Sequence, residues 1–145
     1  SLVLYPAELR ARAVAGPPLD LRGVTLCPLR GAGGQPLTLD AFLPVSFEEC
    51  VAALGRLPRL DAEPDGFFVL AGGQGPTHWS VSGQLFDLGG RMHRVELHGR
   101  CPAAAWDQLL ACFGWPQAAL AFELVRDGVV LDESAFRAML AAAGC

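Results

Sequence analysis

The chain of 145 residues contains no lysine, no isoleucine and no asparagine, so all 11 of its basic residues are arginine. The three missing amino acids share AT-rich codons, and their joint absence indicates a GC-rich bacterial genome. An arginine-only surface would otherwise suggest phosphate recognition. With a formal net charge of -4 and arginines scattered singly among acidic residues, however, the chain has no basic stripe. We therefore expect no nucleic-acid partner.

The sequence also lacks any long apolar run, and it lacks the basic-then-apolar N-terminal pattern of a signal peptide. We therefore expect a cytoplasmic protein with no membrane partner. The five cysteines include no CxxC pair, which is unlike a secreted disulfide framework or a zinc ribbon. No pattern predicts a bound metal or another cofactor.

Charged residues make up only 18% of the chain, whereas hydrophobic residues make up 52%. A chain of this length typically folds around one core, so residues 1–145 are predicted to form a single globular domain. The apolar surplus must either complete that core or remain at the surface, where contiguous apolar patches mark interaction sites. This surplus is the first indication of a binding role.

Local signals predict three helices. Ser46 is followed three residues later by Glu49, which is the capping-box pattern at a helix start. Pro102 opens a second helix, whose apolar stripe is closed by Gly114. Asp132 is suited to cap a third helix near the C-terminus.

Strands are predicted between these helices, together with one further short helix over residues 7–14. The strand patterns cover residues 2–5, 65–73, 79–98 and 120–131. Because consecutive strands are joined by tight turns, the sheet is predicted to be antiparallel. The expected fold is therefore α+β, an antiparallel sheet of short strands and hairpins with about three to four helices packed mainly on one face.

The segment 78–98 holds all three histidines of the chain, and a register can be proposed for it. A three-residue loop over 88–90 pairs Asp87 with Arg91 and separates an apolar face from a polar one. A two-residue Gly-Gly loop would mix the two faces, so we prefer the longer loop. The apolar face then carries Trp79, Val81, Leu85, His93, Val95 and Leu97, and the polar face carries His78, Ser80, Ser82, Gln84, Arg94, Glu96 and His98.

The polar face offers a set of candidate catalytic residues. His78, His98 and Glu96 would suit a divalent metal, and Ser80 opposite His98 would suit a nucleophile with its base. Cys101 precedes the helix that begins at Pro102, a position that lowers a thiol pKa. Any polar strand face yields such a set, so the sequence assigns no catalytic or metal-binding residue.

The remaining candidates concern binding to a partner. On the polar face these are Ser82, Gln84 and Arg94. Trp115 follows the helix-closing Gly114, at a turn where an aromatic side chain either packs on the helix end or becomes an interaction hot spot.

The sequence therefore favours a non-enzymatic protein-interaction module, an accessory, inhibitor or adaptor domain, with a protein partner or a homo-oligomer. The alternative is a small metal-dependent or Ser/Cys hydrolase that uses the His/Glu cluster of the 78–98 hairpin. A small-molecule pocket between sheet and helices is a third option, which no pattern in the sequence marks.

Overall fold

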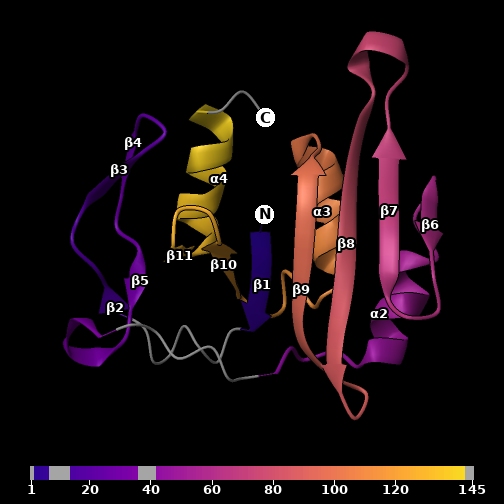
Figure 1. Ribbon diagram of the computed structural model, residues 1–145, viewed down its shortest axis with the longest axis horizontal. Helices are drawn as coiled ribbons and strands as arrows, with labels where there is room; N and C mark the ends of the chain where they lie inside the picture. Colours follow the sequence, from indigo (N-terminus) through magenta and orange to yellow (C-terminus); the bar gives the residue numbers. More distant parts are fainter. Residues whose placement is uncertain (1, 7–13, 36–41, 143–145) are drawn as a thin grey trace.

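The computed structural model describes residues 2–6, 14–35 and 42–142, with the backbone alone for residues 2–6 (Figure 1). Its main feature is a seven-stranded sheet in which every neighbouring pair is antiparallel. In spatial order the strands are β11 (Val129–Leu131), β10 (Leu120–Leu124), β1 (Leu2–Pro6), β9 (Arg91–Arg100), β8 (Trp79–Leu88), β7 (Phe67–Gly72) and β6 (Leu60–Ala62).

The other described elements are helices and four short strands. The helices are α2 (Phe47–Leu54), α3 (Ala103–Ala111) and α4 (Glu133–Ala142), with the 3-10 turns η1 (Ala32–Gly34) and η2 (Gly75–Thr77). Two small sheets pair β2 (Val14–Ala15) with β5 (Leu29–Arg30), and β3 (Leu19–Leu21) with β4 (Val24–Leu26). The predicted α+β class is confirmed. No helix of the described residues is long and apolar enough to cross a membrane.

Most helix signals in the sequence are confirmed by the hydrogen bonds that they predict. The Glu49 amide donates to Ser46 Oγ at 3.1 Å, and the Ser46 amide donates to Glu49 Oε1 at 3.3 Å, which completes the capping box of α2. Asp132 Oδ1 accepts from the Ala135 amide at 2.8 Å at the start of α4. These contacts satisfy backbone N–H groups that a helix N-terminus leaves unpaired.

The core lies on one face of the sheet. Phe136 of α4 stacks on Phe122 of β10, with ring centroids 4.4 Å apart and planes 6° from parallel. Trp106 of α3 meets Phe136 edge-on, with centroids 5.7 Å apart. All three rings are buried, so α3 contacts α4 in the core and α4 packs on β10. In Figure 1, α3 is seen behind β8 and β9.

The predicted register of the β8–β9 hairpin is wrong by one residue beside the loop and by two residues farther along the strands. The loop is the two-residue Gly89–Gly90 turn, with Leu88 opposite Arg91. A register shift follows, because Asp87 lies opposite Met92 whereas Phe86 lies opposite Arg94. His93 is thus the extra residue of a β-bulge.

The bulge explains why the two faces still separate as the sequence predicts. A two-residue loop alone would exchange the faces of one strand, but one extra residue restores the alternation. Val81, Val95 and Leu97 are accordingly buried. His93 is the exception: it is only half-buried and lies beside Phe42, with ring centroids 6.1 Å apart.

Two other predicted elements differ from the structure. Residues 7–13 of the helix predicted over 7–14 lie outside the described residues, and Val14 begins strand β2. Strand β6 was not predicted at all. Its three residues pair with β7 at the edge of the sheet.

A close contact in the core generates the first prediction. A Cβ atom on Gly83 would overlap the ring of Phe68, which is 1% exposed. Gly83→Ala is therefore expected to lower the free energy of unfolding by about 1–3 kcal/mol, because a packed core cannot absorb the extra methyl group. Urea unfolding of the purified variant measures this change.

Gly55→Ala is the matched control. Gly55 has a helical φ of -63° and a Cβ there would lie no closer than 3.4 Å to its neighbours. Its unfolding free energy should stay constant or rise by about 0.4–1 kcal/mol. Equal losses in both variants would contradict the packing that we describe around Phe68.

Candidate functional site

The second face of the sheet, across β7, β8 and β9, carries the polar residues of the hairpin. We call this surface the open face, and Figure 1 shows no described helix or strand in front of it. All its side chains are half-buried or exposed. They are Phe67, Val69, Ala71, Ser80, Ser82, Gln84, Phe86, Arg94, Glu96 and His98.

The register arranges the open face in rows across the strands. One row runs from Phe67 through Gln84 to Glu96, and the next runs from Val69 through Ser82 to His98. Directly opposite residues of an antiparallel pair have Cβ atoms about 4.5–5.5 Å apart, so these side chains are neighbours. Each row therefore sets an apolar side chain from β7 beside polar side chains from β8 and β9.

Arg94 is held in place on this face by three contacts. Its guanidinium carbon lies 4.1 Å from the ring centroid of Phe86. Its Nη1 lies 3.3 Å from His93 Nδ1, and its Nη2 lies 4.0 Å from Glu96 Oε2. The Arg94 side chain remains 30% exposed. It therefore presents a guanidinium whose orientation is set before any partner arrives.

Gln84 is also oriented by the fold. Its Nε2 donates to the carbonyl oxygens of Asp65 at 3.0 Å and Leu85 at 3.2 Å. The bond to Asp65 ties the amide to the turn between β6 and β7. Ser82, Gln84 and Arg94, the binding residues predicted on the hairpin, thus share one surface.

The structure changes the predicted catalytic pairing. Ser80 lies opposite Arg100, and the residue opposite His98 is Ser82. Glu96 lies two residues from His98 on β9, so these two side chains share the open face. The predicted pair of Ser80 with His98 is wrong, because it rested on the three-residue loop.

His78 also lies elsewhere than predicted. It follows η2 and precedes β8, four residues before Ser82, which is opposite His98. At roughly 3.3 Å per residue, the two histidines are about 13 Å apart along the strand direction. Within the described residues, no group of three or more histidine, cysteine or acidic side chains is placed to hold a metal ion.

Cys101 lies just before Pro102, the residue that caps α3, and it is only 4% exposed.

Two other thiols have raised pKa values. Burial, followed by the nearby Cys112 and Glu49, raises the pKa of Cys50 to about 12. Burial also raises the pKa of Cys112 to about 11, although Arg56 acts in the opposite direction. The buried thiols Cys50 and Cys112 therefore stay protonated at neutral pH.

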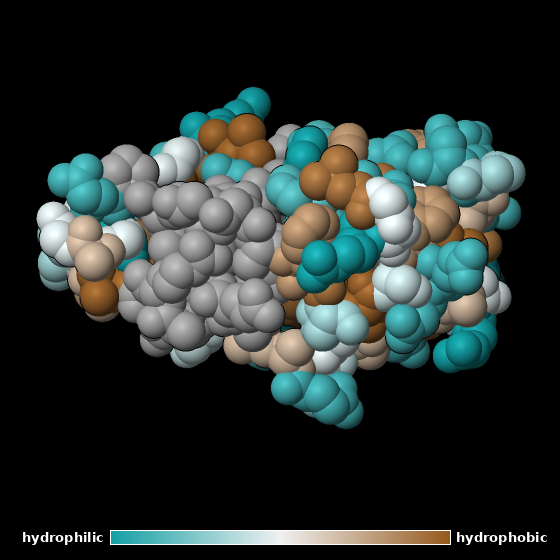
Figure 2. Space-filling view, turned by 90° about the horizontal axis from the view of Figure 1, so that it is seen from below, coloured by the Kyte–Doolittle hydropathy of each residue, from teal (hydrophilic) through white to brown (hydrophobic). Residues whose placement is uncertain are grey.

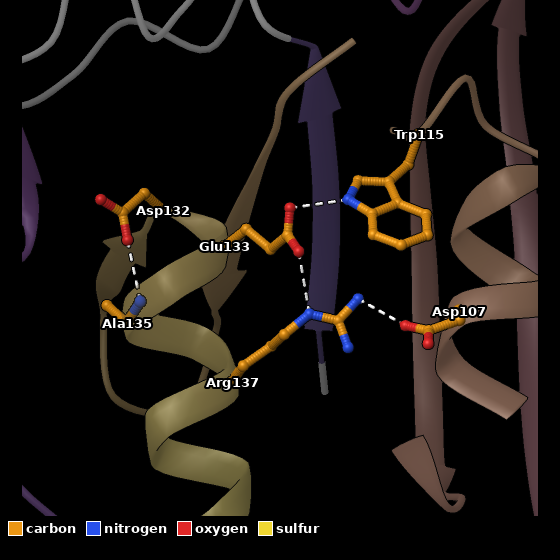
Figure 3. A network of polar contacts seen from close by, with 6 residues as sticks. All are labelled: Asp107, Trp115, Asp132, Glu133, Ala135 and Arg137. Carbon is orange, nitrogen blue, oxygen red and sulfur yellow. Dashed lines mark hydrogen bonds and ion pairs between the residues drawn. The ribbon is translucent and has the colours of Figure 1, made fainter. Parts of the chain in front are cut away.

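Trp115 belongs to a polar network that joins α3 to α4 (Figure 3). Its Nε1 donates to Glu133 Oε1 at 2.6 Å, and Glu133 Oε2 accepts from Arg137 Nε at 2.9 Å. Arg137 Nη2 lies 2.7 Å from Asp107 Oδ1 on α3. Burial lowers the pKa of Arg137, but its bonds to Asp107 and Glu133 outweigh burial and raise it. Trp115 is thus held by its neighbours as part of the fold.

Large exposed hydrophobic side chains occur singly on separate elements. In the view of Figure 2, hydrophobic and hydrophilic residues are interspersed to the right of the grey residues. The exposed ones among the described residues are Val14, Leu19, Leu88 and Val125. Isolated residues of this kind are normal on a protein surface.

Four residues of the open face were not found by sequence reasoning: Phe67, Val69, Ala71 and Phe86. The sequence predicted a strand over residues 65–73 without dividing it into faces, and it gave no face to Phe86. The only signal for their position is that every second residue of a strand lies on the same face.

No protein-family model matches the chain, and no curated protein or solved structure is significantly similar to it.

The thiol pKa values generate the second prediction. At pH 8, a thiol with a pKa of about 12 has a thiolate fraction of roughly 10⁻⁴, so an alkylating reagent should modify exposed Cys27 and leave Cys50 and Cys112 intact. Both folded pKa values exceed the ordinary value of 9.0. Stability from these thiols is therefore complete below pH 9 and is lost as the pH rises toward 11 and 12.

Peptide mass mapping after timed alkylation checks the reactivity, and the same reaction in urea is the control. Modification of Cys50 or Cys112 as fast as that of Cys27, without denaturant, would contradict their burial.

Proposed function

We propose that the chain is a non-enzymatic protein-interaction domain, an accessory, inhibitor or adaptor module, and that the open face is its docking surface. The observation that carries this proposal is the guanidinium of Arg94, which is stacked on Phe86 and still 30% exposed. Arginine and aromatic residues are enriched where protein interfaces gain most of their binding energy. The bacterial and cytoplasmic setting of the domain is also part of the proposal, and it rests on the sequence alone.

The arrangement of layers supports this choice of surface. We infer that α2, α3 and α4 cover the face of the sheet that carries the buried side chains. The opposite face is then left for a partner. There, the half-buried Phe67 and Val69 lie in the same rows as Gln84 and Ser82. A partner that covers these rows would remove apolar surface from water. Its polar groups would contact side chains that the fold has already oriented, those of Gln84 and Arg94.

The edges of the sheet favour docking on a face over addition of a strand. Two hydrogen bonds extend the pairing of β6 with β7 at its two ends. The Ala71 amide donates to the Arg59 carbonyl at 3.2 Å, and the Glu63 amide donates to the Phe67 carbonyl at 2.7 Å. β7 is therefore paired along its length. At the other edge, β11 has three residues and contacts β5. Short or covered edge strands resist the addition of a further strand.

The chemistry of the open face also defines the partner. Arg94 offers a charge-assisted donor, which pairs best with a carboxylate. Phe67, Val69 and Phe86 require apolar side chains opposite them. We therefore propose a protein partner that presents aromatic or aliphatic residues around an aspartate or glutamate.

Selection of a phage-displayed random peptide library on the immobilised chain tests the proposal. The expected result is enrichment of peptides that combine aromatic and acidic residues. Arg94→Ala should weaken their binding about ten-fold or more, as is usual for a central interface arginine. Titration by fluorescence anisotropy with a labelled peptide measures the dissociation constants.

Arg126→Ala is the matched control, because Arg126 is exposed in the turn between β10 and β11 and lies outside the open face. It should leave the affinity unchanged. Enrichment of no peptide, or equal binding to wild type and Arg94→Ala, would overturn the proposal.

The second candidate function is a small hydrolase or metal-dependent enzyme, and one observation favours it. Ser82 lies opposite His98, and Glu96 shares their face, so a nucleophile, a base and a carboxylate occur on neighbouring positions. The enzyme hypothesis predicts that Ser82→Ala and His98→Ala each abolish ester hydrolysis or metal retention while the circular dichroism spectrum is unchanged. Wild-type protein with no esterase activity above buffer and no metal by elemental mass spectrometry would exclude it.

A further inference from the structure

The β-bulge at His93 brings two arginines onto one face of the sheet. Arg91 and Arg94 are three residues apart, and on a regular strand an odd separation places two side chains on opposite faces. In the observed register, Arg91 lies opposite Leu88. Arg94 lies opposite Phe86, which is two residues earlier on β8. Both arginines therefore lie on the open face, about 7 Å apart along the strands.

Each of the two guanidiniums is stacked on an aromatic ring. The guanidinium carbon of Arg91 lies 4.1 Å from the ring centroid of Phe42, and Arg94 has the same distance to Phe86. His93 lies between the two stacks. Its ring meets Phe42 edge-on, with centroids 6.1 Å apart, and its Nδ1 lies 3.3 Å from Arg94 Nη1. These contacts hold both guanidiniums at the turn end of the β8–β9 hairpin (Figure 1) and leave their edges for hydrogen bonds.

Both guanidiniums keep donors that the fold does not use. Within the described part of the chain, no carboxylate forms an ion pair with Arg91, which is exposed. Arg94 Nη2 lies 4.0 Å from Glu96 Oε2, which is too long for a hydrogen bond. Asp87, the other acidic residue of the hairpin, accepts from a backbone amide of the turn at 2.9 Å. Of the five N–H groups of Arg94, at most two are thus directed to His93 and Glu96.

The arginine pair restricts the chemistry of the partner. Like charges at neighbouring positions of a sheet repel each other, so the free chain gives up some stability to set Arg91 beside Arg94. Negative groups on a partner would remove this repulsion and would pair with both guanidiniums. In an extended segment, residues i and i+2 point to the same side and are about 7 Å apart, which matches the spacing of the pair.

We infer that the partner of the open face carries two acidic residues at positions i and i+2 of an extended segment, one for Arg91 and one for Arg94. This inference rests on the proposed docking function. It adds a second acidic position to the partner described there, and it fixes the spacing of the two.

The peptides selected on the immobilised chain test this inference. The expected pattern among them is two acidic residues separated by one other residue. Replacing either acidic residue of such a peptide by its amide should weaken binding about ten-fold, as measured by fluorescence anisotropy. Arg91→Gln removes the charge and keeps a polar end group, and it should weaken binding of the intact peptide by a similar factor.

A double-mutant cycle shows whether Arg91 pairs with a particular carboxylate. Arg91→Gln combined with the peptide that lacks the partner carboxylate should weaken binding little more than either change alone. The exposed Arg126 supplies the matched control, because Arg126→Gln removes the same charge outside the open face and should leave every affinity unchanged. Thermal midpoints by circular dichroism should be equal for both variants and wild type.

The possible failures can be told apart. Enriched peptides with a single acidic residue, or equal binding to wild type and Arg91→Gln, would overturn the inference. The docking function would survive either result if Arg94→Ala still weakened binding. Independent, additive losses in the cycle would also overturn it, because Arg91 would then act only through the net charge of the chain. Enrichment of no peptide would overturn the inference and the docking function together.

Discussion

Strand β1 pairs with β9 on one side and with β10 on the other, and this double pairing holds the sheet together. Without it, the strands from β6 to β9 and the hairpin of β10 and β11 would be two separate small sheets. With it, all seven strands belong to one sheet. On β8 and β9, successive side chains alternate between a buried face, which carries Val81, Val95 and Leu97, and the open face, which carries Ser82, Gln84 and Arg94. The open face, and with it the proposed docking surface, is a consequence of this alternation.

The features that could be predicted from the sequence are those whose causes are local. A capping box at Ser46 and a cap at Asp132 depend on residues three positions away, so they are visible in the sequence alone. The neighbours of β1 depend on residues more than ninety positions away. The bulge at His93 was missed for a related reason. It accompanies the burial of Met92 in the core, which no pattern within the hairpin reveals.

In the candidate site, too, the features with local causes could be predicted and those that depend on distant residues could not. The common face of Ser82, Gln84 and Arg94 could be predicted because alternation survives a register error of two residues. The pairing of Ser82 with His98 could not, because it depends on the exact register. No face was predicted for Phe67 and Val69, since a strand that is apolar throughout gives no local sign of which residues are buried.

The central claim is that the open face is the surface through which the chain acts. Chemical-shift mapping with a peptide selected on the chain tests it most directly, because every backbone amide reports separately. We predict that the largest shifts fall on β7, β8 and β9, centred on Ser82, Gln84 and Arg94. Shifts that cluster instead on α3 and α4, or on the turn between β10 and β11, would contradict the account.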